Sequence, residues 1–149
     1  MSASWFPMAV HALSLLSTSQ EGFSSAYIAS SINTHSVFLR RVLAKLVHNG
    51  LLETKEGGGG GYRLTRSPDQ ITLAEIYTLL EGGSVISASP AEPNKECIVG
   101  SGIQPVFQDV INQVDKVVME KLSQFTISDI SKRALITGNY AIPTIEDHL

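Results

Sequence analysis

The sequence predicts a mainly α-helical protein that carries one small β-hairpin. Apolar residues recur at helical spacing through most of the chain. Two short runs, 51–54 and 62–65, instead alternate along the chain as strands do, and they flank five consecutive glycines at 57–61. With 149 residues and 43% hydrophobic composition, the chain is about one domain long and can bury a packed core.

The first two helices are predicted in segments 4–17 and 24–32. Ser4 is a suitable N-terminal cap for the first, and Pro7 stands near its first helical position. In the second, the spacing puts Ala26, Ala29 and Ile32 on one face. Asn33 and Thr34 then supply turn and capping chemistry, so a tight turn leads into the next segment.

A third helix is predicted over 35–48, with Asn49 and Gly50 as its C-terminal stop. One face is apolar and should be buried: Leu39, Val42, Leu43 and Leu46. The opposite face is polar and cationic: Ser36, Arg40, Arg41, Lys45 and His48. Two helices joined by a tight turn, the second with a basic outer face, are typical of a helix-turn-helix that presents a recognition helix to the DNA major groove.

The run of glycines could in principle cradle a phosphate, act as a linker, or form a hairpin tip. A phosphate-binding loop of the Walker type needs Lys and Ser or Thr directly after its last glycine, and here Tyr62 and Arg63 follow. A linker would not have strand-like residues against both of its ends. The glycines are therefore predicted at the tip of a hairpin, where the backbone can come close to another surface, as a wing does along DNA.

The charge is distributed unevenly, although the net charge is only −3. Segment 35–66 holds six cations and two carboxylates, whereas segment 81–149 holds five cations and nine carboxylates. This asymmetry suggests that one half meets a polyanion and the other half does something else. Ordinary solvated faces are the alternative interpretation that charge alone leaves open.

From Tyr27 to Gly82 the sequence resembles the Rrf2 family of bacterial winged-helix transcriptional regulators. The resemblance rests on "FLRRVLAKLVHNGLLET", on the glycine-rich run closed by "GGY", and on "P", "IT", an amphipathic helix and "EG" after it. It implies a winged helix-turn-helix that binds double-stranded DNA. It also implies a homodimer, more often a repressor, whose two recognition helices and wings read a partly palindromic operator.

Site residues can be assigned on this basis. Ser36, Val37, Phe38, Arg40 and Arg41 occupy the early recognition helix. Of these, Ser36, Arg40 and Arg41 are predicted to contact bases, and Phe38 is an alternative core residue. Contacts to the DNA backbone, or a place in the wing, are predicted for Lys45, Lys55, Gly58, Gly59, Tyr62, Arg63 and Arg66.

The chain departs from the family pattern at two places. Family wings commonly carry an Arg just before the glycines, whereas this chain has Lys55 and Glu56 there, so Lys55 or Arg63 would replace that Arg. Cluster-binding members have three closely spaced cysteines after the "EG" helix, whereas this chain has only Cys97. We therefore expect no cofactor, and in particular no iron–sulfur cluster.

Two interpretations of Cys97 stay open. An unpaired cysteine is commonly a small, buried, inert residue. Alternatively, its thiolate is oxidised or joins a thiol of another molecule, and so shifts the protein between DNA-binding and non-binding states. Its segment is rich in Pro, Gly and Ser, where movement costs little.

The second half is predicted to contain three helices. One begins at Thr72, with Glu75 completing a capping-box pattern. A long one opens at Pro105, and a short terminal one is capped by Thr126 or Ser128. The long helix has a broad apolar stripe, which we assign to a dimer interface: Phe107, Val110, Ile111, Val114, Val118 and Leu122. The predicted division is a DNA-binding domain at 1–82, a linker at 83–103 and a helical dimerisation region at 104–149.

Other classes of protein fit the sequence poorly. No apolar run is long enough to span a membrane and no basic signal-peptide start is present, so we expect a cytoplasmic protein without a membrane partner. The four histidines show no metal-ligand spacing and no nucleophile motif is recognisable, so we expect no enzyme activity. The main alternative is a winged-helix module that binds protein rather than DNA. The operator, the regulated genes and any small-molecule effector are beyond what the sequence identifies.

Overall fold

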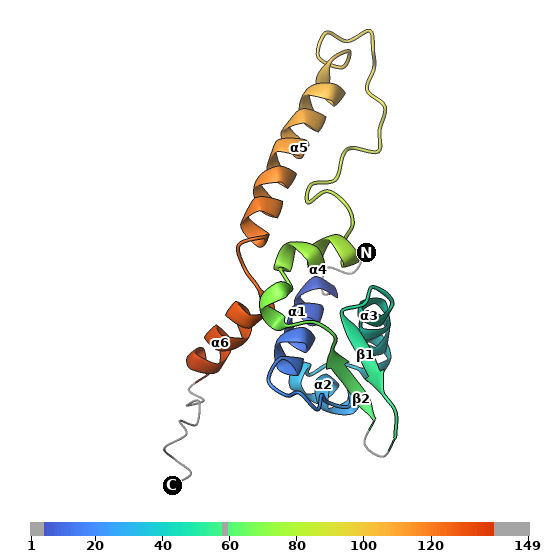
Figure 1. Ribbon diagram of the computed structural model, residues 1–149. Helices are drawn as coiled ribbons and strands as arrows, with labels where there is room; N and C mark the ends of the chain where they lie inside the picture. Colours follow the sequence, from blue (N-terminus) through green and yellow to red (C-terminus); the bar gives the residue numbers. More distant parts are fainter. Residues whose placement is uncertain (1–4, 58–59, 139–149) are drawn as a thin grey trace.

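The structure is a computed structural model that describes residues 5–57 and 60–138. It contains helices α1 (Trp5–Leu16), α2 (Ser25–Ile32), α3 (Ser36–His48) and α4 (Leu73–Leu80), followed by α5 (Ile103–Leu122) and α6 (Ile127–Thr137). A short 3-10 helix, η1 (Pro68–Gln70), precedes α4, and the hairpin consists of β1 (Leu52–Lys55) and β2 (Gly61–Leu64). The predicted fold class, mainly α with one β-hairpin, is confirmed (Figure 1).

Helices α1 to α4 and the hairpin share one hydrophobic core. Its members come from every one of these elements, and the most deeply buried large side chains are Leu13, Leu16, Ile28, Leu39, Leu43, Leu46, Leu51, Leu52, Ile71, Ile76 and Leu80. The apolar face predicted for the third helix is buried as expected, because all four of its residues belong to this core. The face predicted for the second helix was partly wrong: Ile28 is buried, whereas Ala26 is exposed.

The connection between α2 and α3 is a tight turn. Asn33 adopts the left-handed conformation, with φ of 59°, and its N–H donates to the carbonyls of Ala29 and Ser30. The Thr34 N–H also donates to the Ala29 carbonyl, over 3.1 Å. Asparagine tolerates this backbone region better than most residues, which explains why it ends the helix here.

The glycine run forms the hairpin tip, as predicted, although Gly58 and Gly59 lie outside the described residues. Strands β1 and β2 pair in antiparallel fashion, with Leu52 opposite Leu64 and Glu53 opposite Arg63. A third segment joins them, because Phe23 and Tyr62 exchange two backbone hydrogen bonds of 3.0 and 2.9 Å. The connection between α1 and α2 is thereby fastened to the wing.

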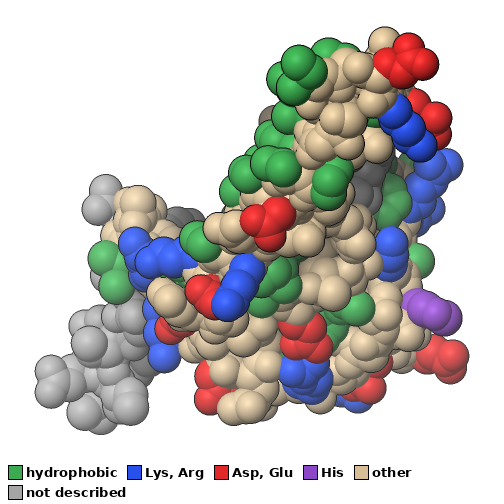
Figure 2. Space-filling view, turned by 90° about the horizontal axis from the view of Figure 1, so that it is seen from above, with side chains coloured by type: hydrophobic (Ala, Val, Ile, Leu, Met, Phe, Trp, Pro, Cys, Tyr) green, Lys and Arg blue, Asp and Glu red, His purple; other side chains and the backbone are tan. Residues whose placement is uncertain are grey.

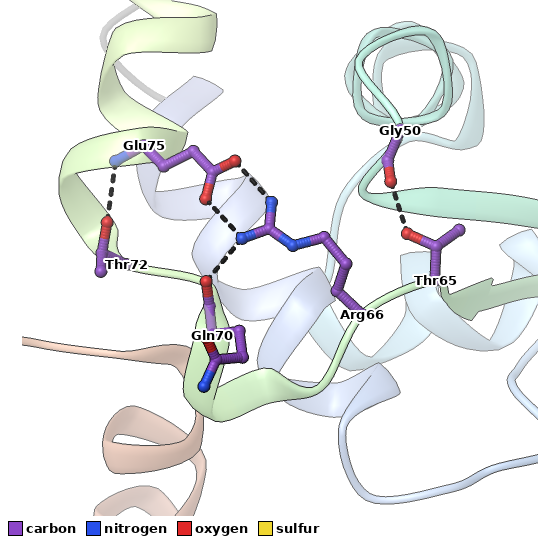
Figure 3. Close-up of polar contacts among 6 residues, drawn as sticks. All are labelled: Gly50, Thr65, Arg66, Gln70, Thr72 and Glu75. Carbon is purple, nitrogen blue, oxygen red and sulfur yellow. Dashed lines mark hydrogen bonds and ion pairs between the residues drawn. The ribbon is translucent and has the colours of Figure 1, made fainter.

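Helix α4 begins as the sequence predicts, but half of the predicted capping box is missing. The Thr72 hydroxyl accepts a hydrogen bond from the Glu75 N–H at 3.2 Å. The Glu75 carboxylate does not return to the Thr72 N–H. It instead accepts two hydrogen bonds from Arg66, because the chain between β2 and α4 brings that guanidinium next to it (Figure 3).

Helix α5 projects from the winged domain as a long arm, and α6 returns to pack beside α1 (Figure 1). Helix α5 starts at Ile103, two residues before the predicted start at Pro105, so the proline lies in its first turn. Proline is tolerated there because the N–H groups of the first turn have no hydrogen-bond partner within the helix. The described residues contain no helix that is both long enough and apolar enough to cross a membrane.

Helix α6 packs on the winged domain, whereas the predicted division puts it in the dimerisation region at 104–149. Ile127 belongs to the core of the winged domain, and the Ser131 hydroxyl donates to the Ser14 carbonyl on α1. Two backbone hydrogen bonds of 2.9 Å, Leu73 N–H to Phe125 and Ile127 N–H to Ile71, fasten the start of α6 beside α4. The arm therefore consists of α5 and the 83–103 segment, while α6 is part of the winged domain. Ser4 and the tail from 139 lie outside the described residues.

Candidate nucleic-acid interface

The exposed face of α3 is where the structure gathers the residues predicted to read DNA. Helical spacing puts Val37, Arg41, Ala44 and His48 on the side opposite the buried stripe, and all four are exposed. Arg40 is exposed along one edge of this face. Arg40 and Arg41 form no ion pair with any residue that the structure describes, so their charges are available to a polyanion.

The N-terminal end of α3 is open to a partner. His35 occupies the cap position, but its side chain makes no capping hydrogen bond. Ser36, one of the predicted base-contact residues, is half-buried in the first turn. Val37 follows it with 64% of its surface exposed. An apolar side chain at this place can contact the methyl group of thymine in the major groove.

Phe38 and Lys45 lie on the other edge of α3, against α1. The Phe38 ring packs edge-on against the Trp5 ring with centroids 5.8 Å apart, so Phe38 is part of the packing between helices. The Lys45 ammonium lies 5.6 Å from the centre of the same Trp5 ring. This cation–π contact holds Lys45 at the side of the recognition face, where it is half-buried.

The three wing cations that the sequence assigns to the DNA backbone are all paired with carboxylates. Lys55 Nζ lies 2.8 Å from Glu21 Oε2, and Arg63 Nε pairs with Glu53 directly across the hairpin. Arg66 donates to both carboxylate oxygens of Glu75, at 2.6 and 3.1 Å. It also donates to the Gln70 carbonyl at 2.6 Å, as Figure 3 shows.

Arg66 is therefore placed to hold the β2–α4 connection together. Glu75 raises the pKa of its guanidinium further above an already high value, so Arg66 stays charged. Tyr62 likewise has a structural position, since its backbone joins the wing to Phe23 and its side chain packs against the core. For these two residues the geometry supports a structural role more than the predicted contact with DNA.

Residue patterns alone missed the carboxylate partners. Glu53 lies opposite Arg63 in the observed register, whereas a hairpin centred on the middle of the glycine run would put Thr65 opposite it, so the sequence pattern does not identify this partner. It does not identify Glu21 either, since Glu21 is 34 positions away from Lys55 and no local pattern links them. Val37 lies in the early recognition helix, but its exposure depends on how α3 packs on α1 and α2, and the sequence pattern does not contain that packing.

The arm carries the residues predicted for a dimer interface. Hydrophobic side chains gather along it in the space-filling view (Figure 2). Phe107 and Val110 are 43% and 44% exposed, and Val106 and Val117 add to the same face. Ile111 and Leu122 differ from the prediction. Ile111 is buried within its own chain, and Leu122 is half-buried and packs against the winged-domain core.

The 83–103 segment runs beside α5. The Val85 N–H donates to the Asp115 carboxylate at 2.9 Å, and a mostly apolar cavity of about 630 Å³ lies between the segment and the helix. Its lining includes Pro93, Phe107 and Ile111.

Cys97 lies in a turn of this segment and is exposed, which removes the interpretation of a buried thiol. The N–H groups of Gly100 and Val99 lower the pKa of the Cys97 thiol, because they stabilise the thiolate. Its neighbours Ile98 and Val99 are exposed as well.

The residues do not fit an iron site. Cys97 is the only cysteine in the sequence. Among residues 5–57 and 60–138, no three side chains of His, Cys, Asp or Glu come together as metal ligands. An iron–sulfur cluster generally takes several thiolates, which this chain alone does not supply.

Comparison with known proteins gives a consistent picture. The family model Rrf2, described as "Iron-dependent Transcriptional regulator", matches residues 3–133. A relative named "Putative HTH-type transcriptional regulator YwnA", from Bacillus subtilis, is 32% identical over 123 residues, which cover 83% of this chain and 91% of YwnA. CymR of the same organism, also named as an HTH-type transcriptional regulator, is 29% identical over 104 residues, covering 70% and 68%. The structure of T. potens IscR matches with a TM-score of 0.70 at 24% identity, covering 100% of this chain and 96% of that one.

Proposed function

The chain belongs to the Rrf2 family of transcriptional regulators, and on that premise we propose that it binds DNA as a homodimer and reads a partly palindromic operator. Its relatives are regulators rather than enzymes. The observation that supports this proposal best is the exposed face of α3, where Arg40 and Arg41 carry unpaired charges within the described structure. Such a face matches the acceptor groups and phosphates of a major groove.

The homodimer is supported by the arm. The exposed apolar residues of α5 line one side of the helix, and a second copy would cover them from water. Pairing would also present two recognition helices to two half-sites, which gains affinity and sets the spacing between the half-sites. A regulator of this kind would work as a repressor in the cytoplasm, by occupying the DNA that a polymerase needs.

Cys97 supports a redox response of this regulator. Its exposure and the N–H groups around it favour a reactive thiolate. The thiolate sulfur would attack one oxygen of hydrogen peroxide, whose O–O bond breaks; the product is a sulfenic acid, and the second oxygen leaves as water after taking up a proton. Since the residues do not fit an iron site, we expect this response without a bound cluster.

The proposal is tested by selecting duplexes from a random DNA pool with the purified protein, reduced and after treatment with hydrogen peroxide. We expect enrichment of a partly palindromic site by the reduced protein. Loss of that enrichment after oxidation in the wild type, but not in Cys97→Ser, would support the redox response. If no sequence is enriched in either state, operator reading is wrong, and a winged-helix module that binds protein becomes the better account.

A further inference from the structure

The outer face of the wing carries four charged residues that neutralise one another. We call Glu21, Glu53, Lys55 and Arg63 the wing quartet. Lys55 pairs with Glu21 over 2.8 Å, and Arg63 pairs with Glu53 across the hairpin. All four side chains are exposed to solvent, between 38% and 86%.

The backbone positions all four residues. Glu53 and Arg63 are directly opposite each other in the strand register, and Lys55 is two residues further along β1. Glu21 precedes Phe23, whose two hydrogen bonds with Tyr62 bring the α1–α2 connection to the free edge of β2. The quartet is therefore a feature of three adjacent backbone segments.

The four groups form one electrostatic cluster. Lys55 lowers the pKa of Glu21 mainly through its hydrogen bond and also through its charge, and the more distant charge of Arg63 lowers it further. Two cations and two anions leave the quartet with no net charge near neutral pH. Arg40 and Arg41 on α3 differ, because no carboxylate in the described part of the chain pairs with either.

From this geometry we infer that Glu21 and Glu53 determine specificity by occupying the wing cations and so weakening binding to non-operator DNA. The inference rests on the proposed function. Binding to non-operator DNA is almost entirely electrostatic, so it depends on how many cations are available to phosphates. A phosphate that approaches Lys55 or Arg63 must displace a carboxylate, and it is repelled by that carboxylate as well. At an operator, base contacts from α3 add energy that non-operator DNA does not receive.

Exposed ion pairs are suited to this role, because they contribute little to folding and exchange partners readily. Neutralising Glu21 and Glu53 should leave the fold intact and release the two cations. The variants are Glu21→Gln, Glu53→Gln and the double substitution. Glu120→Gln is the matched control, since Glu120 is exposed on α5, far from the wing, and forms no ion pair with a described residue.

The measurement is the affinity of each protein for a selected operator and for a scrambled duplex, over a range of salt concentrations. For the double variant we expect scrambled-duplex binding to tighten by about tenfold at low salt, with the log–log salt slope steeper by about 2 per subunit. Operator binding should tighten less, so the specificity ratio falls. Glu120→Gln should behave like the wild type.

A second pair of substitutions makes the test decisive. Lys55→Met and Arg63→Met, added together to the double glutamine variant, give a quartet that again has no net charge, so scrambled-duplex binding and its salt slope should return to the wild-type values. If this fourfold variant binds the scrambled duplex more weakly than the wild type and with a shallower salt slope, the wild-type cations already contact phosphates and the inference is wrong. Equal binding by the double glutamine variant and Glu120→Gln would also overturn it while leaving the proposed function intact. If the wild type binds no duplex at all, the proposed function fails, and the inference fails with it.

Discussion

Gly61 is a residue at which the wing and the α1–α2 connection come close together. A Cβ atom placed there would overlap the Phe23 carbonyl oxygen and would lie 2.7 Å from its carbon, and both are backbone atoms that cannot swing away. The close approach allows the two Phe23–Tyr62 hydrogen bonds to form. Glycine is therefore required at this position for space rather than for an unusual backbone conformation.

We expect Gly61→Ala to lower the free energy of unfolding by about 1–3 kcal/mol, because the backbones must move apart to admit the methyl group. Urea unfolding monitored by circular dichroism measures this. Gly102→Ala is the matched control, since a Cβ atom at Gly102 would meet nothing within 4 Å. It should cost about 0.5 kcal/mol or less. Equal stability of the two variants would show that the contact at Gly61 is not tight.

Arg40 and Arg41 are the residues on which sequence reading should depend. We expect Arg40→Ala or Arg41→Ala to weaken operator binding by about 1–3 kcal/mol where a base contact is lost. Fluorescence anisotropy with the selected operator measures the change. Arg133→Ala removes an equal charge from the exposed surface of α6 and serves as the control. Unchanged operator affinity in both α3 variants would exclude these arginines as readers.

At the scale of elements, the start of α6 is stabilised by a capping box in its first turn. The sequence predicts Thr126 or Ser128 as its cap, and the structure selects Thr126. The Thr126 hydroxyl accepts a hydrogen bond from the Asp129 N–H at 3.1 Å, and the Asp129 carboxylate accepts one from the Thr126 N–H at 2.9 Å. This reciprocal capping box starts the helix that packs on α1.

Thr126→Ala should therefore lower the free energy of unfolding by about 0.5–2 kcal/mol, whereas Ser128→Ala should have little effect. The Thr126 N–H, followed by the Thr126 hydroxyl, lowers the pKa of Asp129 in the folded protein. The stabilisation is thus fully present above the unfolded pKa of about 3.9 and is lost as the pH falls through the lower folded pKa.

Urea midpoints of the wild type and Asp129→Asn should accordingly differ at pH 6, and the difference should shrink as the pH falls below the unfolded pKa of about 3.9. A difference that stays constant over this range would show that the charge of Asp129 does not contribute to the cap.

At the scale of the whole molecule, the exposed apolar face of α5 is the proposed interface between two chains. We expect Val110→Asp to convert a dimer into monomers, because it puts a charge in the middle of the exposed apolar face of α5. Sedimentation velocity measures the change. Asn112→Asp adds the same charge on the opposite side of α5 and should leave the dimer intact. A monomeric wild type, or a dimeric Val110→Asp, would contradict this assignment of the interface.

The elements themselves were predictable from the sequence because their causes are local. The apolar stripe of α3, the turn at Asn33, the cap at Thr126 and the glycines of the hairpin each act within a few residues. The exposed side of α3 followed directly from its buried side, and so did the prediction that Arg40 and Arg41 face a partner. These patterns were enough to indicate a winged helix and the helix that we propose to read DNA.

Tertiary structure alone decided which distant groups meet. Glu75 joins Arg66 instead of completing a capping box, Glu21 reaches Lys55, and α6 packs on the winged domain rather than on the arm. An exposed carboxylate pairs with whichever cation the folded backbone brings near, and a sequence pattern does not contain that distance. The sequence by itself therefore determined which elements form and which face of α3 is free. The three-dimensional packing determined which charges remain available to DNA.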